Sequence, residues 1–242
     1  GVNSQADALL SALDNVGSHG LRQETYHRSA ITERLPEVRE LVASGSPVEP
    51  ESVAGLDLLL SDAFLTLGIR LIRGRVNPET MHPTWNAPRR RADLVAALEQ
   101  ALSQHRVVDT LEELGPRQAG YQRLREGLAR YRALAVAGDW RSLDEGPTLR
   151  LGSTGTRVER LRQRLIATGD LEASHSGDAP FDPTLEAAVK TFQNRHGLDV
   201  DGQVGSGTGE ALNVPIAARI AQLEANLERW RWLPDDLGAR HV

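Results

Sequence analysis

Arginine is concentrated in one short stretch of this sequence, from Arg150 to Arg164, which holds five arginines and one glutamate. Arg157, Arg160 and Arg164 follow an i, i+3, i+7 spacing, which predicts one side of a helix, beside its apolar stripe. The planar guanidinium group donates two parallel hydrogen bonds to a carboxylate. The spacing therefore predicts a face that binds carboxylates, and the alternative is the solvated helix face that such charge runs usually form.

A second polar group, Gln193, Arg195 and His196, falls near the expected end of a later helix. Their amide, guanidinium and imidazole groups can all hydrogen-bond a polar ligand. The aromatic residues of this part of the chain are Phe181 and Phe192, and both take expected core positions rather than positions for stacking on a sugar ring. The three polar residues are therefore further candidates for ligand contact, with an exposed helix end as the alternative.

Residue types for covalent, metal or phosphate chemistry are scarce. The chain has no cysteine, which removes a thiol nucleophile, a thiolate metal site and a disulfide framework. The glycine-rich run 205–209 lacks the lysine and the preceding strand of a phosphate-binding loop. No carboxylate pair stands out, and we expect no catalytic residue, metal or cofactor in this chain. The histidines lack metal-ligand spacing on one helix: His19, His27, His82, His105, His175, His196 and His241.

Composition indicates a folded protein of one or two domains, with 242 residues of which 40% are hydrophobic and 25% charged. The net charge of −5 argues against a nucleic-acid-binding protein and makes the run 89–91 a solvated helix start. The most apolar window, 53–72, contains Asp57, Asp62 and Arg70. It predicts a buried amphipathic helix rather than a transmembrane segment. No signal peptide is visible at the polar N-terminus.

The arginine-rich stretch is expected to form the first of three short helices. Thr156 and Glu159 have the spacing of a capping box, and Gly169 stands where a C-terminal glycine belongs. The apolar residues between these signals recur at helical spacing: Val158, Leu161 and Leu165.

Two further helix starts follow. Asp182 is expected to cap a helix that has Pro183 at its first position. After a tight turn at Asp201 and Gly202, a last short helix is expected to begin near 205–206. Three short helices can bury one small shared core, and the stripe of the middle one has helical spacing: Leu185, Ala188, Val189 and Phe192.

Taken in order, residues 149–213 resemble the peptidoglycan-binding domain of bacterial cell-wall enzymes. Two features depart from that family: Asp182 stands where glycine is usual, and 172–180 reads as an insertion of small polar residues. The resemblance implies a three-helix fold and peptidoglycan as the partner, whose peptide stems carry the carboxylates that the arginines would bind. The matching positions are Leu151, Gly152, Gly155, Val158, Leu161, Leu165, Phe181, Thr184, Ala188, Val189, Phe192, Gln193, Gly197, Leu198, Asp201, Gly202, Val204, Gly205, Thr208 and Leu212.

The residues before this module predict a helical domain centred on a long helix at 51–73. Pro36 is expected to end or kink the helix at 26–43. The connector 138–147 marks the domain boundary. We therefore predict an all-α fold with three parts: a helical scaffold domain (1–140), a three-helix peptidoglycan-binding domain (148–213) and a C-terminal connecting helix (215–242).

The connecting helix carries an apolar seam whose steps alternate between four and three residues and which ends at Trp230. Trp232 lies about 200° around the helix from Trp230, at 100° per residue. We expect the two tryptophans to dock domains, with Trp230 packed on the module and Trp232 facing a following domain.

This order of parts, ending in the run 226–234, resembles the large periplasmic L,D-transpeptidases of Gram-negative bacteria. Those enzymes have a helical scaffold, a peptidoglycan-binding domain and a C-terminal catalytic domain with a cysteine nucleophile. The resemblance implies a non-catalytic chain, exported to the periplasm, whose partners are peptidoglycan and a catalytic domain of the same protein. Two alternatives remain: a helical hydrolase of peptidoglycan, and a spacer or protein-interaction module without glycan affinity.

Overall fold

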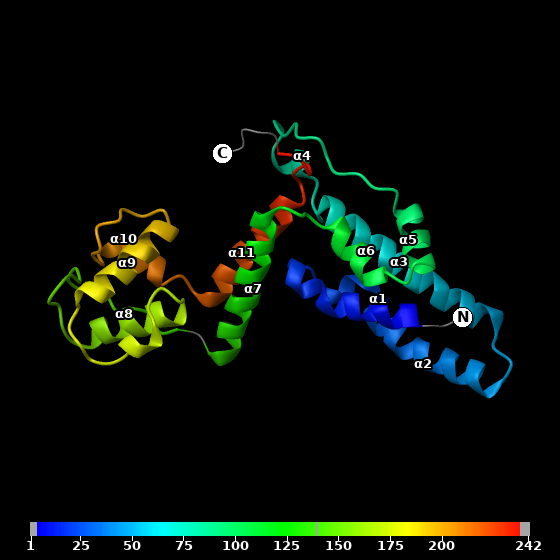
Figure 1. The fold of residues 1–242 in the computed structure, drawn as a ribbon, viewed down its shortest axis with the longest axis horizontal. Coiled ribbons are helices and arrows are strands. Elements are labelled where there is room, and N and C mark those ends of the chain that lie inside the picture. The colour runs from blue at the N-terminus through cyan, green and yellow to red at the C-terminus, as the bar shows by residue number, and fades with distance from the viewer. Residues whose placement is uncertain (1–3, 139, 238–242) are drawn as a thin grey trace. The chain divides into compact units, whose positions relative to one another are not determined.

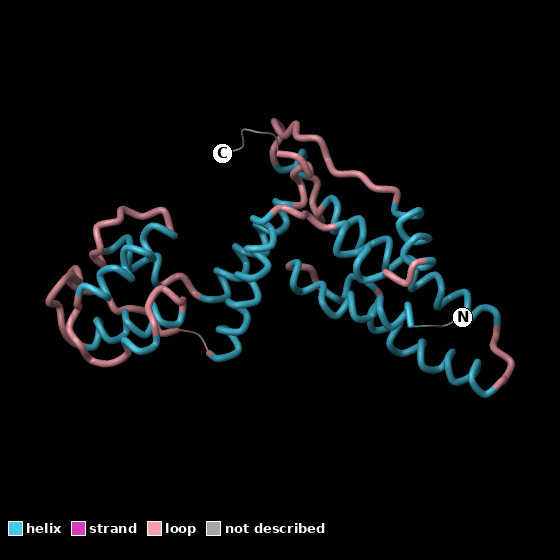
Figure 2. Tube along the Cα trace, in the orientation of Figure 1, coloured by secondary structure: helices cyan, strands magenta, loops and turns pink. Residues whose placement is uncertain are grey.

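The computed structural model describes residues 4–138 and 140–237, and within these ranges every regular element is a helix (Figures 1 and 2). Outside the helices, the backbones of Leu149 and Val204 form an isolated antiparallel β-bridge. The predicted all-α fold is confirmed for the described residues.

The chain forms two compact units, residues 1–129 with 222–242, and residues 130–221. Helices α7 (Ala119–Ala137) and α11 (Ile216–Trp230) each run across a division between them. The C-terminal part of α11 therefore belongs to the same unit as the N-terminal helices. The bounds of the three predicted parts stay a prediction.

The first unit, which we call the scaffold unit, is organised around the long helix α3. This helix contacts α2, α5 and α6, while α1 packs on α6 (Figure 1). Its stripe enters the core at Leu56, Phe64, Leu67 and Leu71, as helical spacing requires. The elements are α1 (Ser4–Asn15), η1 (Val16–His19), η2 (Gln23–Tyr26), α2 (Arg28–Ser44), α3 (Pro50–Arg73), α4 (Pro78–Met81), α5 (Leu94–Ser103) and α6 (Val107–Leu114).

Helix α3 is long and apolar enough to cross a membrane by length and composition, although core helices of soluble proteins pass the same test. Its apolar stripe packs in the core of the scaffold unit. The burial of this stripe agrees with the amphipathic helix that the charges within 53–72 predict.

Pro36 does not end its helix, so of the two expected effects the end is wrong and the kink stays a prediction. Helix α2 continues through this residue to Ser44. Pro36 is exposed, whereas Leu35 and Val38 beside it are buried in the core. A proline costs one helical hydrogen bond, and we attribute the continued helix to the packing of these flanking side chains.

The second unit, which we call the module, contains the three predicted short helices and the short turn η3. Their apolar faces meet in one core that includes Leu161, Leu165, Leu185 and Phe192. The bridge between Leu149 and Val204 joins the segments that precede α8 and α10. The elements are α8 (Thr156–Ala167), η3 (Ala173–His175), α9 (Pro183–Arg195) and α10 (Ser206–Leu212).

The helix ends of the module match the sequence signals at three of four points, and one of these is the start of α10 at Ser206. Asp182 caps α9 by accepting a hydrogen bond from the Leu185 N–H, and Gly169 follows α8 with φ 73°. The predicted capping box is wrong. Thr156 is the first residue of α8, and the N-cap residue is Gly155, which has no side chain to cap the helix. Gly155 has φ 96°, which favours glycine, and its carbonyl accepts the first hydrogen bonds of the helix.

Candidate ligand-binding site

A pocket of about 300 Å³ lies beside α8 within the module. It combines side chains from the end of α7, the connector and α8. Two of the three predicted arginines line it, and the connector adds an aromatic ring and a further cation. The polar and aromatic residues of this α8 pocket are Trp140, Arg141, Arg160, Gln163 and Arg164.

Arg164 is the most buried cation of the α8 pocket, with 5% of its surface exposed. Its guanidinium carbon lies 3.3 Å from the ring centroid of Trp140, and its Nε donates to the Leu212 carbonyl at 3.0 Å. Its second nitrogen, Nη1, is buried without a hydrogen-bond partner among the described residues. Burial lowers the pKa of Arg164 to about 10, so the group stays charged at neutral pH.

Arg157 and Arg160 hold the connector against α8. Arg157 donates to the carbonyls of Asp144, at 2.9 Å, and Pro147, at 2.6 Å. Arg160 pairs with the Asp144 carboxylate, which is largely exposed. The alternative of a solvated helix face is therefore wrong for Arg164, which is buried. Arg160 bonds to a carboxylate that a ligand carboxylate could replace.

Gln193 is buried inside the module and does not form part of an exposed helix end. Its amide nitrogen donates to the Asp201 carboxylate at 2.8 Å and to the Gln203 carbonyl at 2.9 Å. Its amide oxygen accepts from the Gly202 N–H at 2.9 Å. These bonds fix the turn at 201–202 to α9, so both ends of the Gln193 amide have partners within the protein.

Arg195 and His196 end α9 close to the charge of Arg164. Arg195 donates to the Asp170 carboxylate at 2.6 Å. His196 stacks on Phe192, with ring centroids 4.2 Å apart. Burial, then the charges of Arg219, Arg195 and Arg164, lower the pKa of His196 to about 4. His196 is therefore neutral at pH 7 and can accept or donate a hydrogen bond, but adds no charge.

Sequence reasoning missed Trp140, Arg141 and Gln163 as members of this pocket. Trp140 packs edge-on against Tyr131, and its indole N–H donates to the Val214 carbonyl at 3.2 Å. These contacts place the indole face beside Arg164. A tryptophan followed by an arginine in the connector was the available signal, but the partners of the ring are distant in sequence.

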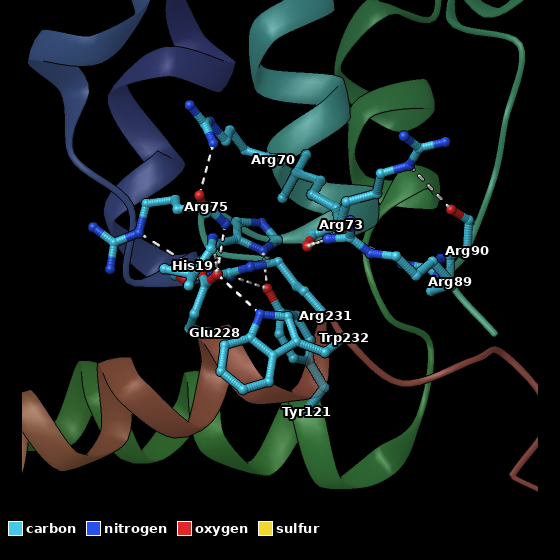
Figure 3. Close-up of polar contacts among 12 residues, drawn as sticks. His19, Arg70, Arg73, Arg75, Arg89, Arg90, Tyr121, Glu228, Arg231 and Trp232 are labelled. Carbon is cyan, nitrogen blue, oxygen red and sulfur yellow. Dashed lines mark hydrogen bonds and ion pairs between the residues drawn. The ribbon is translucent and has the colours of Figure 1, made fainter. Parts of the chain in front are cut away.

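The scaffold unit contains a second polar group, the buried cluster around Arg231 (Figure 3). The Arg231 side chain is completely buried. It donates to the His19 carbonyl at 2.8 Å, the Tyr121 hydroxyl at 3.1 Å and the Glu228 carboxylate at 2.8 Å. One guanidinium thereby joins the end of α11 to η1 and α7.

Glu228 is the anion of this cluster. Its carboxylate accepts the backbone N–H groups of Arg75, at 2.5 Å, and Val76, at 3.0 Å, and the indole N–H of Trp232, at 3.2 Å (Figure 3). Burial alone would raise the pKa of Glu228, but these hydrogen bonds and the Arg231 charge outweigh it and lower the pKa. Glu228 is therefore ionised at neutral pH.

His19 is buried between two partners, the Tyr121 hydroxyl at 2.8 Å and the Glu112 carboxylate at 3.2 Å. Burial lowers the pKa of His19, so the ring is neutral at pH 7. Hydrogen bonds from His19 and Arg125 lower the pKa of Glu112 to about 2. At neutral pH, His19 is therefore neutral, and Glu112 and Glu228 are ionised. Within the described ranges, no group of three or more His, Asp or Glu side chains could hold a metal ion.

Both tryptophans at the end of α11 lie in the scaffold unit, which corrects the expected docking arrangement. Trp232 is 4% exposed and packs edge-on against Trp85, with ring centroids 5.9 Å apart. Trp230 lies so close to Gly120 of α7 that a Cβ atom there would overlap its six-membered ring. Trp230 therefore packs on α7, and Trp232 does not face outward.

Comparison with known proteins agrees with this division of the chain. Residues 1–128 match a family described as "Scaffold domain", and residues 154–212 match one described as "Putative peptidoglycan binding domain". The chain is also similar to "N-acetylmuramoyl-L-alanine amidase CwlL" of Bacillus licheniformis, with 35% identity over 71 residues. The aligned part is 29% of this chain and 20% of that protein. The second family match supports peptidoglycan as a partner.

Proposed function

The chain belongs to the Scaffold domain family, and on that premise we propose that it holds a cell-wall enzyme on peptidoglycan without performing the reaction itself. The observation that supports this role is the match of 154–212 to a peptidoglycan-binding domain, in a module that carries the cationic α8 pocket. The proposal keeps the division into a scaffold (1–140), a binding domain (148–213) and a connecting helix (215–242) that leads to a catalytic domain.

The α8 pocket is the proposed contact for the carboxylates of peptide stems. Arg164 is held by Leu212 and Trp140, so little side-chain entropy is lost when its free nitrogen donates to a ligand. Arg160 exchanges the Asp144 carboxylate for that of the ligand. Arg141 is exposed at the same pocket and adds attraction at longer range.

A binding assay on purified sacculi tests this contact. The double variant Arg141→Glu with Arg160→Glu places two negative charges in the pocket, and these repel the carboxylates of the ligand. We therefore expect about fivefold weaker co-sedimentation. Arg150→Glu, on an exposed residue of the same module outside the pocket, is the matched control and keeps wild-type binding.

The two other results have separate meanings. Equal sedimentation of the double variant and the wild type would remove the α8 pocket from the proposal. A wild-type chain that stays in the supernatant would favour a spacer or protein-interaction role without glycan affinity.

For the parent protein, we propose an L,D-transpeptidase in the periplasm of a Gram-negative bacterium. The support is the order of helical scaffold, binding module and terminal helix, which resembles those enzymes. Acyl transfer by a cysteine needs a thiolate and a base. This chain has no cysteine, so the nucleophile would belong to the catalytic domain.

A second candidate parent is an amidase, because the relative named above is an N-acetylmuramoyl-L-alanine amidase. The chain spans about a fifth of that protein, so the activity is a proposal only. Sacculi treated with the whole parent protein discriminate the two: new cross-links between stems indicate a transpeptidase, and free stem peptides indicate an amidase. The 242-residue chain alone is expected to release no soluble fragments, and release would indicate a hydrolase.

A further inference from the structure

The scaffold unit has an aromatic pocket of about 520 Å³ that neither family match assigns a role. Three of the four tryptophans of the chain line it: Trp85, Trp230 and Trp232. The volume lies within the usual range for small-ligand sites, about 300–1,000 Å³. We call it the tryptophan pocket, and its polar lining residues are His82, Arg123, Asn226 and Arg229.

The three indole rings are fixed by contacts that do not involve a ligand. Trp232 is anchored by its hydrogen bond to Glu228 and meets Trp85 at an interplanar angle of 85°. Trp230 lies against α7 at Gly120, where the missing side chain makes room for the ring. Trp85 and Trp230 are only partly buried, so aromatic surface remains available in the pocket.

Trp85 also has an unused hydrogen-bond donor. Its indole nitrogen is buried and has no partner among the described residues, whereas buried tryptophan N–H groups usually find one. The backbone of Trp85 is held by a hydrogen bond from its N–H to the His82 carbonyl at 2.8 Å. The residue is therefore positioned, and its buried side-chain donor has no partner within the described part of the chain.

Among the polar lining residues, Arg123 and Arg229 are cations and Asn226 carries an amide. Arg229 donates to the Asn226 side chain at 2.9 Å, which orders both groups. Arg123 is exposed at the same pocket. No aspartate or glutamate is among the described lining residues. Flat apolar faces with hydrogen-bond donors around them suit a ring that has an apolar face and polar edges, and the cations favour a ligand that also carries a carboxylate.

From these observations we propose that the tryptophan pocket binds the sugar backbone of peptidoglycan. Amino-sugar rings stack on Trp85 and Trp230, the Trp85 N–H and Asn226 bond their hydroxyl and amide groups, and the arginines pair with the carboxylates of those sugars that carry no peptide stem. This contact is separate from the one proposed for peptide stems at the α8 pocket. It lies in the scaffold unit, so it does not depend on the module.

Isothermal titration calorimetry of the 242-residue chain with peptide-free glycan strands tests the proposal. Trp85→Leu removes the stacking face and the free donor, and we expect at least about tenfold weaker binding. Met81→Ala is the matched control, because Met81 is exposed in the same segment and does not line the pocket. Circular dichroism verifies that each variant is folded, and Trp85→Phe keeps stacking and most of the affinity.

A second titration isolates the carboxylate contact. The pair Arg123→Ala with Arg229→Ala weakens binding of glycan strands, whose alternate sugars carry a carboxyl group. It weakens binding of an uncharged N-acetylglucosamine tetramer less, because that ligand has no carboxylate and loses only the ordering of Asn226 by Arg229. Equal loss for both ligands would overturn the assigned role of the arginines.

Two results would overturn the pocket as a whole: no binding of either glycan by the wild type, or wild-type affinity in Trp85→Leu. Failure here is distinct from failure of the proposed function. Sacculi retain their peptide stems, and their co-sedimentation is sensitive to the α8 pocket, whereas the glycan strands used here carry no stems.

Discussion

At the scale of single residues, burial decides which predicted ligand residues remain available to a ligand. Arg164 and Gln193 are both inside the module, yet they differ. The Gln193 amide bonds to protein groups at both ends, whereas Arg164 retains one buried nitrogen without a partner in the described part of the chain. A buried donor without a hydrogen-bond acceptor costs free energy. Arg164 is therefore a stronger candidate for ligand contact than Gln193.

The pKa of His196 gives a pH prediction for the module. Its folded pKa of about 4 lies below the ordinary value of 6.5, so protonation favours the unfolded state. Stability is then constant above about pH 6.5 and falls as the pH drops toward 4. We expect the module to lose up to about 2 kcal/mol between pH 7 and pH 5, measured by differential scanning calorimetry.

The substitution His196→Leu removes the titrating ring and should flatten this part of the pH profile. His82→Asn, at an exposed histidine of the scaffold unit, is the control and leaves the profile of the module unchanged. A profile of the same slope in His196→Leu and the wild type contradicts the prediction.

At the scale of helices, Asp182 shows why a departure from the family pattern is tolerated. Its carboxylate caps α9 through the Leu185 N–H at 2.8 Å and pairs with the buried Arg162 at 2.7 Å. Burial would raise the pKa of Asp182, but the Leu185 and Arg162 bonds lower it overall. The aspartate therefore has two partners that a glycine would lack.

Asp182→Ala removes the cap and leaves Arg162 with carbonyl partners only. A lost N-cap costs about 1 kcal/mol, and the unpaired guanidinium adds to it, so we expect a loss of about 1–3 kcal/mol. Urea unfolding of the module measures it. Asp178→Ala, at an exposed aspartate nearby, should change stability by less than about 0.5 kcal/mol. Equal stability of both variants would show that the Asp182 contacts contribute nothing.

Helix positions could be predicted because apolar spacing and end signals are local. The Asp182–Pro183 start and the end at Gly169 follow from neighbouring residues alone. The cap at Thr156 is wrong, and α2 does not take the expected end at Pro36, because the positive φ of Gly155 and the packing of Leu35 depend on the folded surroundings. Spacing likewise placed Arg164 beside a stripe, but its burial against Trp140 comes from a distant segment.

At the scale of the whole chain, the stripe of α11 was visible in the sequence but its partner was not. Periodicity shows that a face is buried and does not show against what. The end of α11 packs in the scaffold unit through Arg231, Glu228 and Trp232. Both ion-pair partners lie at one helix end, while their contacts with His19, Arg75, Val76 and Tyr121 join them to residues more than 100 positions away.

Arg231→Met tests this joining of distant segments. It leaves the buried Glu228 carboxylate with Arg75, at 3.6 Å, in place of the closer Arg231, and removing one partner of a buried ion pair costs about 3–5 kcal/mol. Thermal and urea unfolding of the scaffold unit should record this loss. The neighbouring exposed Arg229→Met should have little effect on stability. A second change, Glu228→Gln, should recover part of the loss, and absence of both effects would contradict a structural role for the pair.

The return of α11 to the N-terminal helices also bears on how the chain is made. Residues 130–221 form their unit from one continuous stretch, whereas the scaffold unit needs 222–237 to supply Arg231 and Trp232. During synthesis, the continuous stretch can fold as soon as it leaves the ribosome. The N-terminal helices are made first, and their contacts with Arg231 can form only after the end of α11 has been synthesised.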